Sequence, residues 1–306
     1  MNDPLPLLGA IEAGGTKIVC GIGDAIGGSR ETTTIATRDV ETTVRDIIAF
    51  FEAGQARHGA VAAIGIASFG PLDLDPRSPG FGRITTTPKP GWQGADLPTR
   101  IGAALGVPTA IDTDVNAAAL AEARLGAARG RQSVAYVTVG TGIGVGLVIG
   151  GRMVHGLGHP EAGHLLPRRH PGHGDFAGIC PYHGDCLEGL AAGPAIAAAW
   201  GGSLAELAPD HPAWDIEADY LGQLCAMLIL TAAPEHIVLG GGVMSQRRLS
   251  EAVRGETLRR LAGYAAAWSD PATATARITA PGCAEPSGLI GAYLLAQDSS
   301  GAPPRT

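Results

Sequence analysis

The sequence predicts an α/β fold with mixed sheets, divided into two domains. Three observations lead to this prediction. Short apolar strands alternate with helices, hairpins occur beside crossover helices, and a glycine-turn hairpin appears twice, with its turns beginning at Gly14 and Gly140. A chain of 306 residues has room for two domains of ordinary size. We therefore expect a duplicated unit in which each half carries its own glycine turn.

The first predicted domain covers residues 1–115 and is completed by a returning segment at about 287–300. Two short apolar strands, 7–13 and 17–23, flank the turn Gly14-Gly15-Thr16-Lys17 and predict the first hairpin. Apolar residues at helical spacing, short apolar runs and Gly/Pro clusters mark the other elements. In chain order these are a helix at 38–58, a buried strand at 61–68, a Pro-rich loop at 75–98, a helix at 99–105 and a strand at 108–112.

The second predicted domain covers residues 116–286 and begins with an Ala-rich helix. Two apolar strands around Gly140-Thr141-Gly142 predict the second hairpin within 133–150. A loop rich in histidine, 155–188, follows. The later predicted elements are helices at 187–200 and 220–233, a strand at 235–239 that stops at Gly240-Gly241-Gly242, further helices, a short strand at 276–280 and a closing apolar helix at 288–297 that returns to the first domain.

The composition excludes several classes of protein. The chain has 22 basic and 29 acidic residues, and no Lys/Arg run supplies the basic surface that a nucleic-acid backbone requires. The longest apolar stretches, such as 224–233, are too short to cross a membrane, and residues 1–6 show no signal-peptide pattern. We expect a cytoplasmic protein without nucleic-acid or membrane partners. Only two basic residues are lysines, Lys17 and Lys89, which we ascribe to a coding bias toward arginine.

The five cysteines do not predict disulfides, because a cytosolic chain rarely holds structural ones. Cys20, Cys225 and Cys283 each stand among apolar or small residues, which is typical of buried packing. Cys180 and Cys186 remain as a pair inside the loop 155–188.

The same loop predicts a metal site. Cys180, His183 and Cys186 follow one another at three-residue spacing, and His164 stands upstream. Two thiolates and two imidazoles suit a closed tetrahedral Zn²⁺ site, which indicates a structural metal and leaves no open position for a hydrolytic water. The loop also holds four spare histidines, although a lone histidine is more often a surface or internally bonded residue: His155, His159, His170 and His173.

The two glycine turns predict anion binding. Turns without Cβ atoms let an anion approach the backbone amides, and two such turns could grip a polyphosphate. Neither turn is a Walker A motif or a strict G-x-G-x-x-G pattern, and one glycine hairpin alone is more often only a turn. The third strand end at Gly240-Gly241-Gly242 strengthens the nucleotide interpretation.

Taken together, these glycine motifs resemble those of the ROK (repressor, open reading frame, kinase) family, within the actin-like sugar-kinase superfamily. The resemblance extends over nearly the whole chain. The segments that carry the resemblance are residues 12–17, 138–144 and 239–243. More narrowly, residues 85–92 and 180–189 resemble the zinc-containing bacterial fructokinase branch. The resemblance implies an actin-like, ribonuclease H-like two-domain ATPase fold with an interdomain cleft.

The resemblance also assigns ATP, Mg²⁺ and the catalytic base. It implies that Asp114, in Thr113-Asp114-Val115-Asn116, is the base for a sugar hydroxyl, with Asp112 as the competing candidate. Glu12 stands where the family has aspartate and is the candidate for contact with Mg²⁺. The implied ATP-binding residues are Gly14, Gly15, Thr16, Lys17, Gly140, Thr141, Gly142, Gly240, Gly241 and Gly242.

The resemblance further implies a set of sugar contacts: Asn116, Glu161, His164, Glu188 and Gly70. His164 can ligate zinc with one ring nitrogen and donate to the sugar with the other. The turn at Gly70 is equally consistent with a structural role. Lys89 and Trp92 are expected either to border the cleft or, for the tryptophan, to pack on its own domain.

The function expected from these residues is ATP-dependent phosphorylation of a hexose, with D-fructose first. A mannokinase, glucokinase or N-acylmannosamine kinase of the same family is the alternative. From other classes, we consider a sugar-responsive repressor, a zinc hydrolase and a catalytically silent sugar or ATP binder. The repressor is disfavoured because the first strand begins at about Leu7, which leaves no room for a helix-turn-helix before it. The resemblance implies a homodimer.

Overall fold

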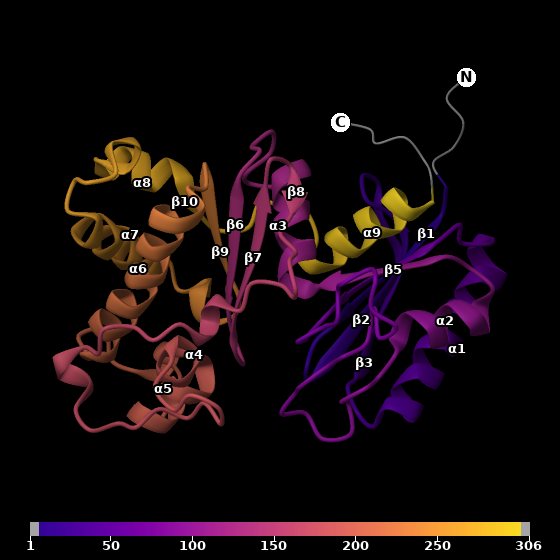
Figure 1. The fold of residues 1–306 in the computed structure, drawn as a ribbon, viewed down its shortest axis with the longest axis horizontal. Coiled ribbons are helices and arrows are strands. Elements are labelled where there is room, and N and C mark those ends of the chain that lie inside the picture. Colours follow the sequence, from indigo (N-terminus) through magenta and orange to yellow (C-terminus); the bar gives the residue numbers. More distant parts are fainter. Residues whose placement is uncertain (1–5, 301–306) are drawn as a thin grey trace. The chain divides into compact units, whose positions relative to one another are not determined.

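The computed structural model describes residues 6–300, and the chain divides into two compact units (Figure 1). The first unit contains the chain as far as Gly126, the segment Met153–His159 and the C-terminal segment from Cys283. The second contains Ala127–Arg152 and Pro160–Gly282. Within residues 6–300, no helix combines the length and the apolar character needed to cross a bilayer.

The first unit is built on a five-stranded mixed sheet. Its central strand pairs antiparallel with one neighbour and parallel with the other, so the sheet combines a hairpin with crossover connections. The strand order is β3-β2-β1-β4-β5. The strands are β1 (Leu8–Ala13), β2 (Lys17–Asp24), β3 (Gly28–Ala36), β4 (Ile64–Ser68) and β5 (Thr109–Thr113).

Helices cover the two faces of this sheet. Ile64 and Ile66 of β4 lie in a core with Phe51 of α1 and Ile101 of α2, whereas Gly65 between them faces α9. A Cβ at Gly65 would lie 1.8 Å from the carbonyl oxygen of Ala292, so glycine is required for α9 to pack this closely on β4. The helices are α1 (Val40–His58), α2 (Leu97–Leu105), α3 (Asp114–Arg124) and α9 (Ser287–Ser299).

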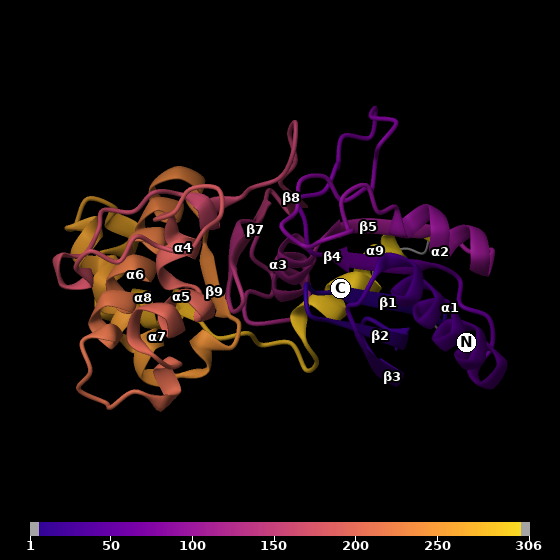
Figure 2. The ribbon, with the colours of Figure 1, turned by 90° about the horizontal axis from the view of Figure 1, so that it is seen from below.

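The second unit repeats this sheet topology. A hairpin again pairs antiparallel, its first strand again has a parallel neighbour on the other side, and the order is β10-β9-β6-β7-β8. Figure 1 labels these strands, and Figure 2 shows the same unit from below. The predicted recurrence of the hairpin is therefore confirmed. The strands are β6 (Val134–Val139), β7 (Ile143–Ile149), β8 (Arg152–Met153), β9 (His236–Gly240) and β10 (Ile278–Thr279).

An apolar core joins this second sheet to its helices. Val137 and Val139 of β6 pack in one cluster with Leu190 of α4, Leu224 of α6 and Val253 of α7. The helices are α4 (Leu187–Ala191), α5 (Gly193–Trp200), α6 (Ala213–Ala232), α7 (Arg247–Leu261) and α8 (Pro271–Arg277). Short 3-10 turns lie at Ala162–His164, Pro171–His173, Leu204–Glu206, Val243–Ser245 and Ala266–Trp268.

Three elements differ from the expectations. Strand β3 was not predicted, because its sequence is rich in threonine and charge and its side chains are partly or fully exposed at the edge of the sheet. The helix expected at 187–200 is two helices, with a break before Gly193-Pro194. The helix expected at 220–233 begins seven residues earlier, at Ala213, directly after a proline.

The structure also draws the boundary between units elsewhere than at 115/116. Helix α3 packs against α9 and therefore belongs with the first unit, which extends to Gly126. The segment Met153–His159, expected in the second domain, also clusters with the first unit. Of the three cysteines expected to be buried, Cys20 and Cys225 are buried and Cys283 is only partly so.

Candidate functional site

Three of the predicted site segments lie at one edge of the first sheet. Strands β1, β4 and β5 run parallel, with Ala13 opposite Ser68 and Ser68 opposite Thr113. The carboxyl ends of all three strands therefore meet at the same edge. This edge carries the first glycine turn (Gly14 to Lys17), Gly70 and the pair Asp112 and Asp114. In open α/β sheets, ligands bind at the carboxyl ends of the strands.

The backbone of the first glycine turn is fixed through its carbonyl oxygens. The Thr37 hydroxyl donates to Gly14 O at 2.8 Å, and the Thr37 amide donates to Thr16 O at 3.0 Å. The Lys89 ammonium donates to Gly15 O at 2.7 Å. The amides of Gly15 and Thr16, in contrast, have no backbone partner among the residues that the structure describes. A turn with engaged carbonyls and available amides suits an anion.

Glu12 lies beside this turn, one residue before the end of β1. A Cβ at Gly288, in the first turn of α9, would lie 2.5 Å from Glu12 Oε1, so the carboxylate occupies space that only a glycine leaves open. Burial raises the pKa of Glu12, and the charge of Lys17 opposes this rise. A carboxylate near a phosphate-binding turn is the kind of ligand that Mg²⁺ combines with phosphate oxygens.

The two aspartates after β5 have different environments. Asp112 is buried, and its Oδ1 accepts from the Thr113 amide at 2.7 Å and from Asn116 Nδ2 at 2.9 Å. Its Oδ2 lies 2.7 Å from His155 Nε2. These partners occupy three of the roughly four lone-pair sites of a buried carboxylate, so Asp112 is a poor candidate for a base.

Asp114 is partly exposed in the first turn of α3, where its Oδ1 accepts from the Val115 amide at 2.9 Å. The helix begins here because the Thr113 hydroxyl accepts from the Asn116 amide and caps it. Of the two candidates for the base, the geometry favours Asp114.

His155 and His159 anchor the segment Met153–His159 within the first unit. His159 Nε2 accepts from the Leu72 amide at 3.0 Å, just after the Gly70-Pro71 peptide bond, which is cis. The hydrogen bond to Asp112 raises the pKa of His155, although partial burial opposes it. Both spare histidines therefore have partners in the first unit.

The other two spare histidines belong to the second unit. His170 Nδ1 accepts from the Gly172 amide at 3.0 Å. His173 is buried, with Nδ1 2.9 Å from the Tyr220 hydroxyl and its ring stacked on those of Phe176 and Trp200. Neither histidine belongs to the group of potential metal ligands found within residues 6–300.

The second glycine turn is held by its own backbone and by an acid. The Gly140 amide donates to Gly142 O at 2.9 Å, and the Gly193 amide donates to Gly140 O at 2.8 Å. Glu188 Oε2 accepts from the Ile143 amide at 3.0 Å, directly after the turn. A Cβ at Gly142 would lie 2.4 Å from the same carboxylate oxygen. Glu188 is thus part of the support of this turn.

The third glycine turn requires its central glycine. Gly241 has a φ of +88°, which L side chains rarely adopt. A Cβ at Gly241 would also lie 2.3 Å from Val139 O, at the start of the second turn. Residues Gly240 to Gly242, at the end of β9, and Gly140 to Gly142, at the end of β6, therefore lie at one edge of the second sheet, because β6 and β9 are parallel neighbours.

Three residues expected to contact the sugar gather near the second turn. Glu188 bonds to it directly, and its charge acts on Glu161. Loss of solvent around the carboxyl group and, after it, the charge of Glu188 raise the pKa of Glu161 to about 7. His164 follows in the 3-10 turn Ala162–His164, whose backbone contacts that of Ile143 closely.

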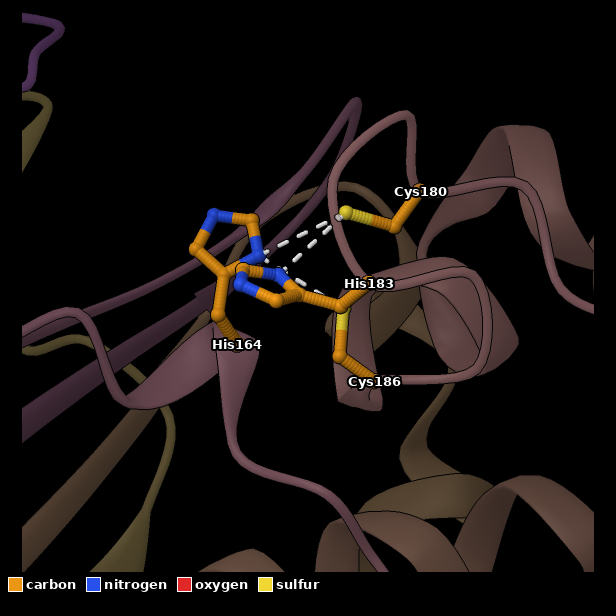
Figure 3. Close-up of side chains that lie close together, drawn as sticks. All are labelled: His164, Cys180, His183 and Cys186. Carbon is orange, nitrogen blue, oxygen red and sulfur yellow. Dashed lines mark hydrogen bonds between the residues drawn. The ribbon is translucent and has the colours of Figure 1, made fainter. Parts of the chain in front are cut away.

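The four predicted metal ligands converge in the second unit (Figure 3). The donor atoms of His164, Cys180, His183 and Cys186 all lie within 4.8 Å of one another. His164 Nδ1 lies 3.7 Å from Cys180 Sγ and 3.5 Å from Cys186 Sγ, and His183 Nδ1 lies 3.7 Å from Cys180 Sγ. A tetrahedral Zn²⁺ with ordinary bond lengths would separate sulfur and nitrogen ligands by about 3.5 Å.

Local backbone structure explains how these ligands come together. Cys180 and Gly184 exchange backbone hydrogen bonds of 3.1 and 2.9 Å, which forms a tight loop holding Cys180 and His183. Gly184 has a φ of +63°, as the turn requires. Cys186 is the residue before α4. The two thiols are buried, His164 is partly exposed and His183 is exposed.

Sequence reasoning missed two contacts of the first unit. Trp92 packs in the core of its own unit, which was one of the two expectations for it. Sequence reasoning placed Lys89 only at the border of the expected cleft, whereas Lys89 contacts the first glycine turn. The same reasoning treated His155 only as a spare metal ligand, although it pairs with Asp112. The rarity of lysine in this chain was the signal that would have pointed to Lys89.

Comparisons with known proteins agree with this geometry. The ROK family matches residues 8–299. A fructokinase from Zymomonas mobilis is 42% identical over 97% of this chain and 98% of its own length. A fructokinase from Pediococcus pentosaceus is 40% identical over 95% of this chain and 98% of its own.

Solved structures show the same fold. A ROK hexokinase from Thermus thermophilus superposes with a TM-score of 0.75 and 31% identity, covering 95% of this chain and 97% of that one. A ROK glucokinase from Streptomyces griseus, in complex with glucose and AMPPNP, gives 0.74 and 27%, covering 95% of this chain and 99% of that one. The predicted α/β fold class with mixed sheets is confirmed.

Proposed function

The chain belongs to the ROK family, and from this premise we propose that it is an ATP-dependent fructokinase that converts D-fructose to D-fructose 6-phosphate. The observation that carries the proposal is the position of Asp114, at the same sheet edge as the first glycine turn. Its competitor Asp112 is buried and already engaged in three hydrogen bonds. The fructokinases that match nearly the whole chain at 40–42% identity support fructose as the substrate.

In this proposal Asp114 accepts the proton of the fructose 6-hydroxyl as the oxygen attacks the γ-phosphorus of ATP. The new O–P bond forms while the bond to the β,γ-bridging oxygen breaks, and ADP leaves with the electron pair. A positioned carboxylate accelerates such a proton transfer by about 10²–10⁴-fold. Asn116, whose amide group is oriented by Asp112, is proposed to hold a sugar hydroxyl.

The glycine turns are proposed to bind ATP. Phosphoryl transfer gains most of its catalysis from positioning and from charge neutralisation, which backbone amides supply without side chains in the way. Bound Mg²⁺ would neutralise the phosphate oxygens. Glu12 fits this ion, because Mg²⁺ in kinases is held by one or two carboxylates together with phosphate oxygens.

We propose that the cluster of His164, Cys180, His183 and Cys186 binds structural Zn²⁺. The separations of 3.5 to 3.7 Å between sulfur and nitrogen fit a tetrahedral site, and two thiolates balance the charge of the ion. His164 directs Nδ1 at the cluster, which leaves Nε2 for a sugar hydroxyl. Glu161, Glu188 and Gly70 remain proposed sugar contacts on the strength of the family resemblance.

A test of the function measures ADP release with MgATP and each of four sugars: fructose, mannose, glucose and N-acetylmannosamine. Fructose-dominant turnover is expected. Dominant turnover of another sugar would keep the kinase mechanism and replace the substrate. No turnover with any of them would instead favour a silent binder.

The Asp114→Asn variant tests the role of the base. We expect kcat to fall about 10³-fold while the affinity for MgADP stays within about twofold, because only the proton acceptor is lost. Asp46→Asn, an aspartate on α1 that pairs with Arg38, is the matched control and should keep its full rate. Substantial turnover by Asp114→Asn would remove this residue from its role.

The homodimer stays a prediction that light scattering can decide.

A further inference from the structure

Lys89 braces the first glycine turn from a distant part of the chain. Its Nζ donates to Gly15 O at 2.7 Å and to Thr37 O at 3.3 Å. Thr37 in turn bonds to Gly14 O and Thr16 O. The lysine therefore joins the turn to the residue that holds the carbonyls on either side of Gly15.

The loop around Lys89 is anchored so that its side chain reaches the turn. Trp92 is fully buried, and its Nε1 donates to Arg38 O at 2.8 Å. Its ring lies 5.2 Å from that of Phe69, between centroids. The Trp92 amide donates to Lys89 O at 3.3 Å, which links the anchor to the lysine.

The chain has only two lysines, and both lie at the first glycine turn. Lys17 ends the turn, and its charge acts on Glu12, while Lys89 bonds to Gly15. The other 20 basic residues are arginines. An ammonium is a compact charge with three donors, so Lys89 can serve two converging carbonyls and still offer one donor.

The fixed carbonyl oxygens of the turn and the positive charge of Lys89 both favour a bound polyphosphate. Fixing the carbonyl oxygens of Gly14, Gly15 and Thr16 keeps these negative ends of the peptide dipoles away from the amide side of the turn. A positive charge held against the turn lowers the energy of an anion beside it. We propose that Lys89 is a positioning residue for the phosphates of ATP, which fixes the first glycine turn and adds its charge to the triphosphate site. This inference rests on the proposed kinase function.

The test compares Lys89→Met, Lys89→Gln and Lys89→Arg with the wild type. We expect kcat/KM for MgATP to fall about 10- to 100-fold in the Met and Gln variants, since a charge-assisted contact is lost. The KM for fructose at saturating MgATP should stay within about twofold. Arginine, which keeps the charge but not the geometry, should restore part of the loss. Arg83→Gln, which removes an exposed cation from the same loop, is the matched control.

Calorimetric titration with MgADP supplies a readout that does not require turnover. Weaker MgADP binding in Lys89→Met and Lys89→Gln, with a smaller dependence on salt than in the wild type, supports the proposal. Unchanged binding and unchanged kcat/KM for MgATP overturn it. Full recovery by glutamine overturns it as well, because the charge would then have no part. Failure of all three variants to fold would show a purely structural role.

The two proposals fail in distinguishable ways. Absence of sugar-dependent turnover by the wild-type protein counts against the kinase, while the MgADP titrations still measure the effect of Lys89. Turnover by the wild type together with unchanged Lys89 variants counts against the role of Lys89 alone.

Discussion

The two halves of the molecule share one sheet topology, but the charged side chains that hold their glycine turns have opposite signs. The first turn is held by Lys89, a cation, together with Thr37. The second is held by Glu188, an anion, together with the Gly193 amide. A hairpin, an outer strand and two parallel strands recur in both halves. The duplicated backbone thus supplies the same bare turn twice, and the side chains around each turn decide what it does.

The two halves also differ at the ends of their outer parallel strands. Strand β5 runs into Asp112 and Asp114, whereas β10, its counterpart, runs into Ala280 and Pro281. Among the described residues 6–300, the Cys/His cluster lies in the second half, on a segment that contacts its turn through Glu188 and Gly163. The proposed base therefore belongs to the first repeat and the proposed metal site to the second, a division of roles that substitutions in each half can test.

Removal of the proposed metal should produce the largest change in stability, and the change should be confined to the second half. We expect a Cys180→Ser/Cys186→Ser variant, or the wild type treated with a strong chelator, to lose more than about 5 °C of Tm, because the loop would lose its cross-link. Hydrogen exchange should quicken in 160–190 while β1, β4 and β5 stay protected. Cys225→Ser, a change at a buried cysteine outside the cluster, is the control. Equal loosening of both sheets would contradict the division.

Alanine in place of one glycine of each turn should give the next largest effect, and the effect should differ between the two turns. A Cβ at Gly142 meets Glu188 at 2.4 Å, whereas a Cβ at Gly15 meets nothing within 4 Å. Gly142→Ala should therefore lower the free energy of unfolding by about 1–2 kcal/mol, as the bond from Ile143 to Glu188 is displaced. Gly15→Ala should change it by less than about 0.5 kcal/mol and weaken MgADP binding instead. Urea unfolding and MgADP titration of both variants provide the measurements, and equal losses of stability would refute the contrast.

Two histidines, one in each half, should give the smallest effects, and these should have opposite signs. The pKa of His155 is raised by Asp112, so its contribution to stability is present below its ordinary pKa and is lost as the pH rises through the raised value. The pKa of His173 is lowered, first by burial, so its contribution is present above the ordinary pKa and is lost as the pH falls.

Urea unfolding at pH 5.5, 7 and 8.5 can measure this difference. His155→Gln should flatten the alkaline side of the stability profile, and His173→Gln the acid side. His58→Gln provides a control for His155, because His58 also pairs with a carboxylate, that of Glu31, but lies away from the proposed site. A change of the same sign in both test variants would contradict the assignment.

The sequence predicted most of what backbone periodicity and motif spacing determine. Local signals predicted several features. Apolar runs and glycine turns predicted both hairpins, the central strands and the helix at 40–58, and Cys/His spacing predicted the cluster of potential metal ligands. Strand β3 was missed because an edge strand rich in polar residues has no apolar alternation to reveal it. The extent of the first unit was missed because the packing of α3 on α9 joins residues more than 150 positions apart.

The candidate site shows the same limit. Its glycines and Asp114 stand in recognisable motifs, whereas the contact of Lys89 with Gly15 spans 74 positions. The pairing of His155 with Asp112 spans 43 positions. Contacts of this kind depend on the tertiary fold, and no local pattern encodes them.

The packing of α9 on the first sheet affects the order in which the two units can fold during synthesis. This helix packs on β1, β4 and β5, and Gly65 contacts its backbone, yet it follows every element of the second unit along the chain. All five strands of the first sheet have emerged by Gly126, but the sheet lacks this cover until α9 emerges. The second unit is complete once Gly282 has emerged. The second unit, which is synthesised later, can therefore finish folding earlier than the first. Until α9 emerges, the face of the first sheet that it covers stays exposed, and chaperones can bind there.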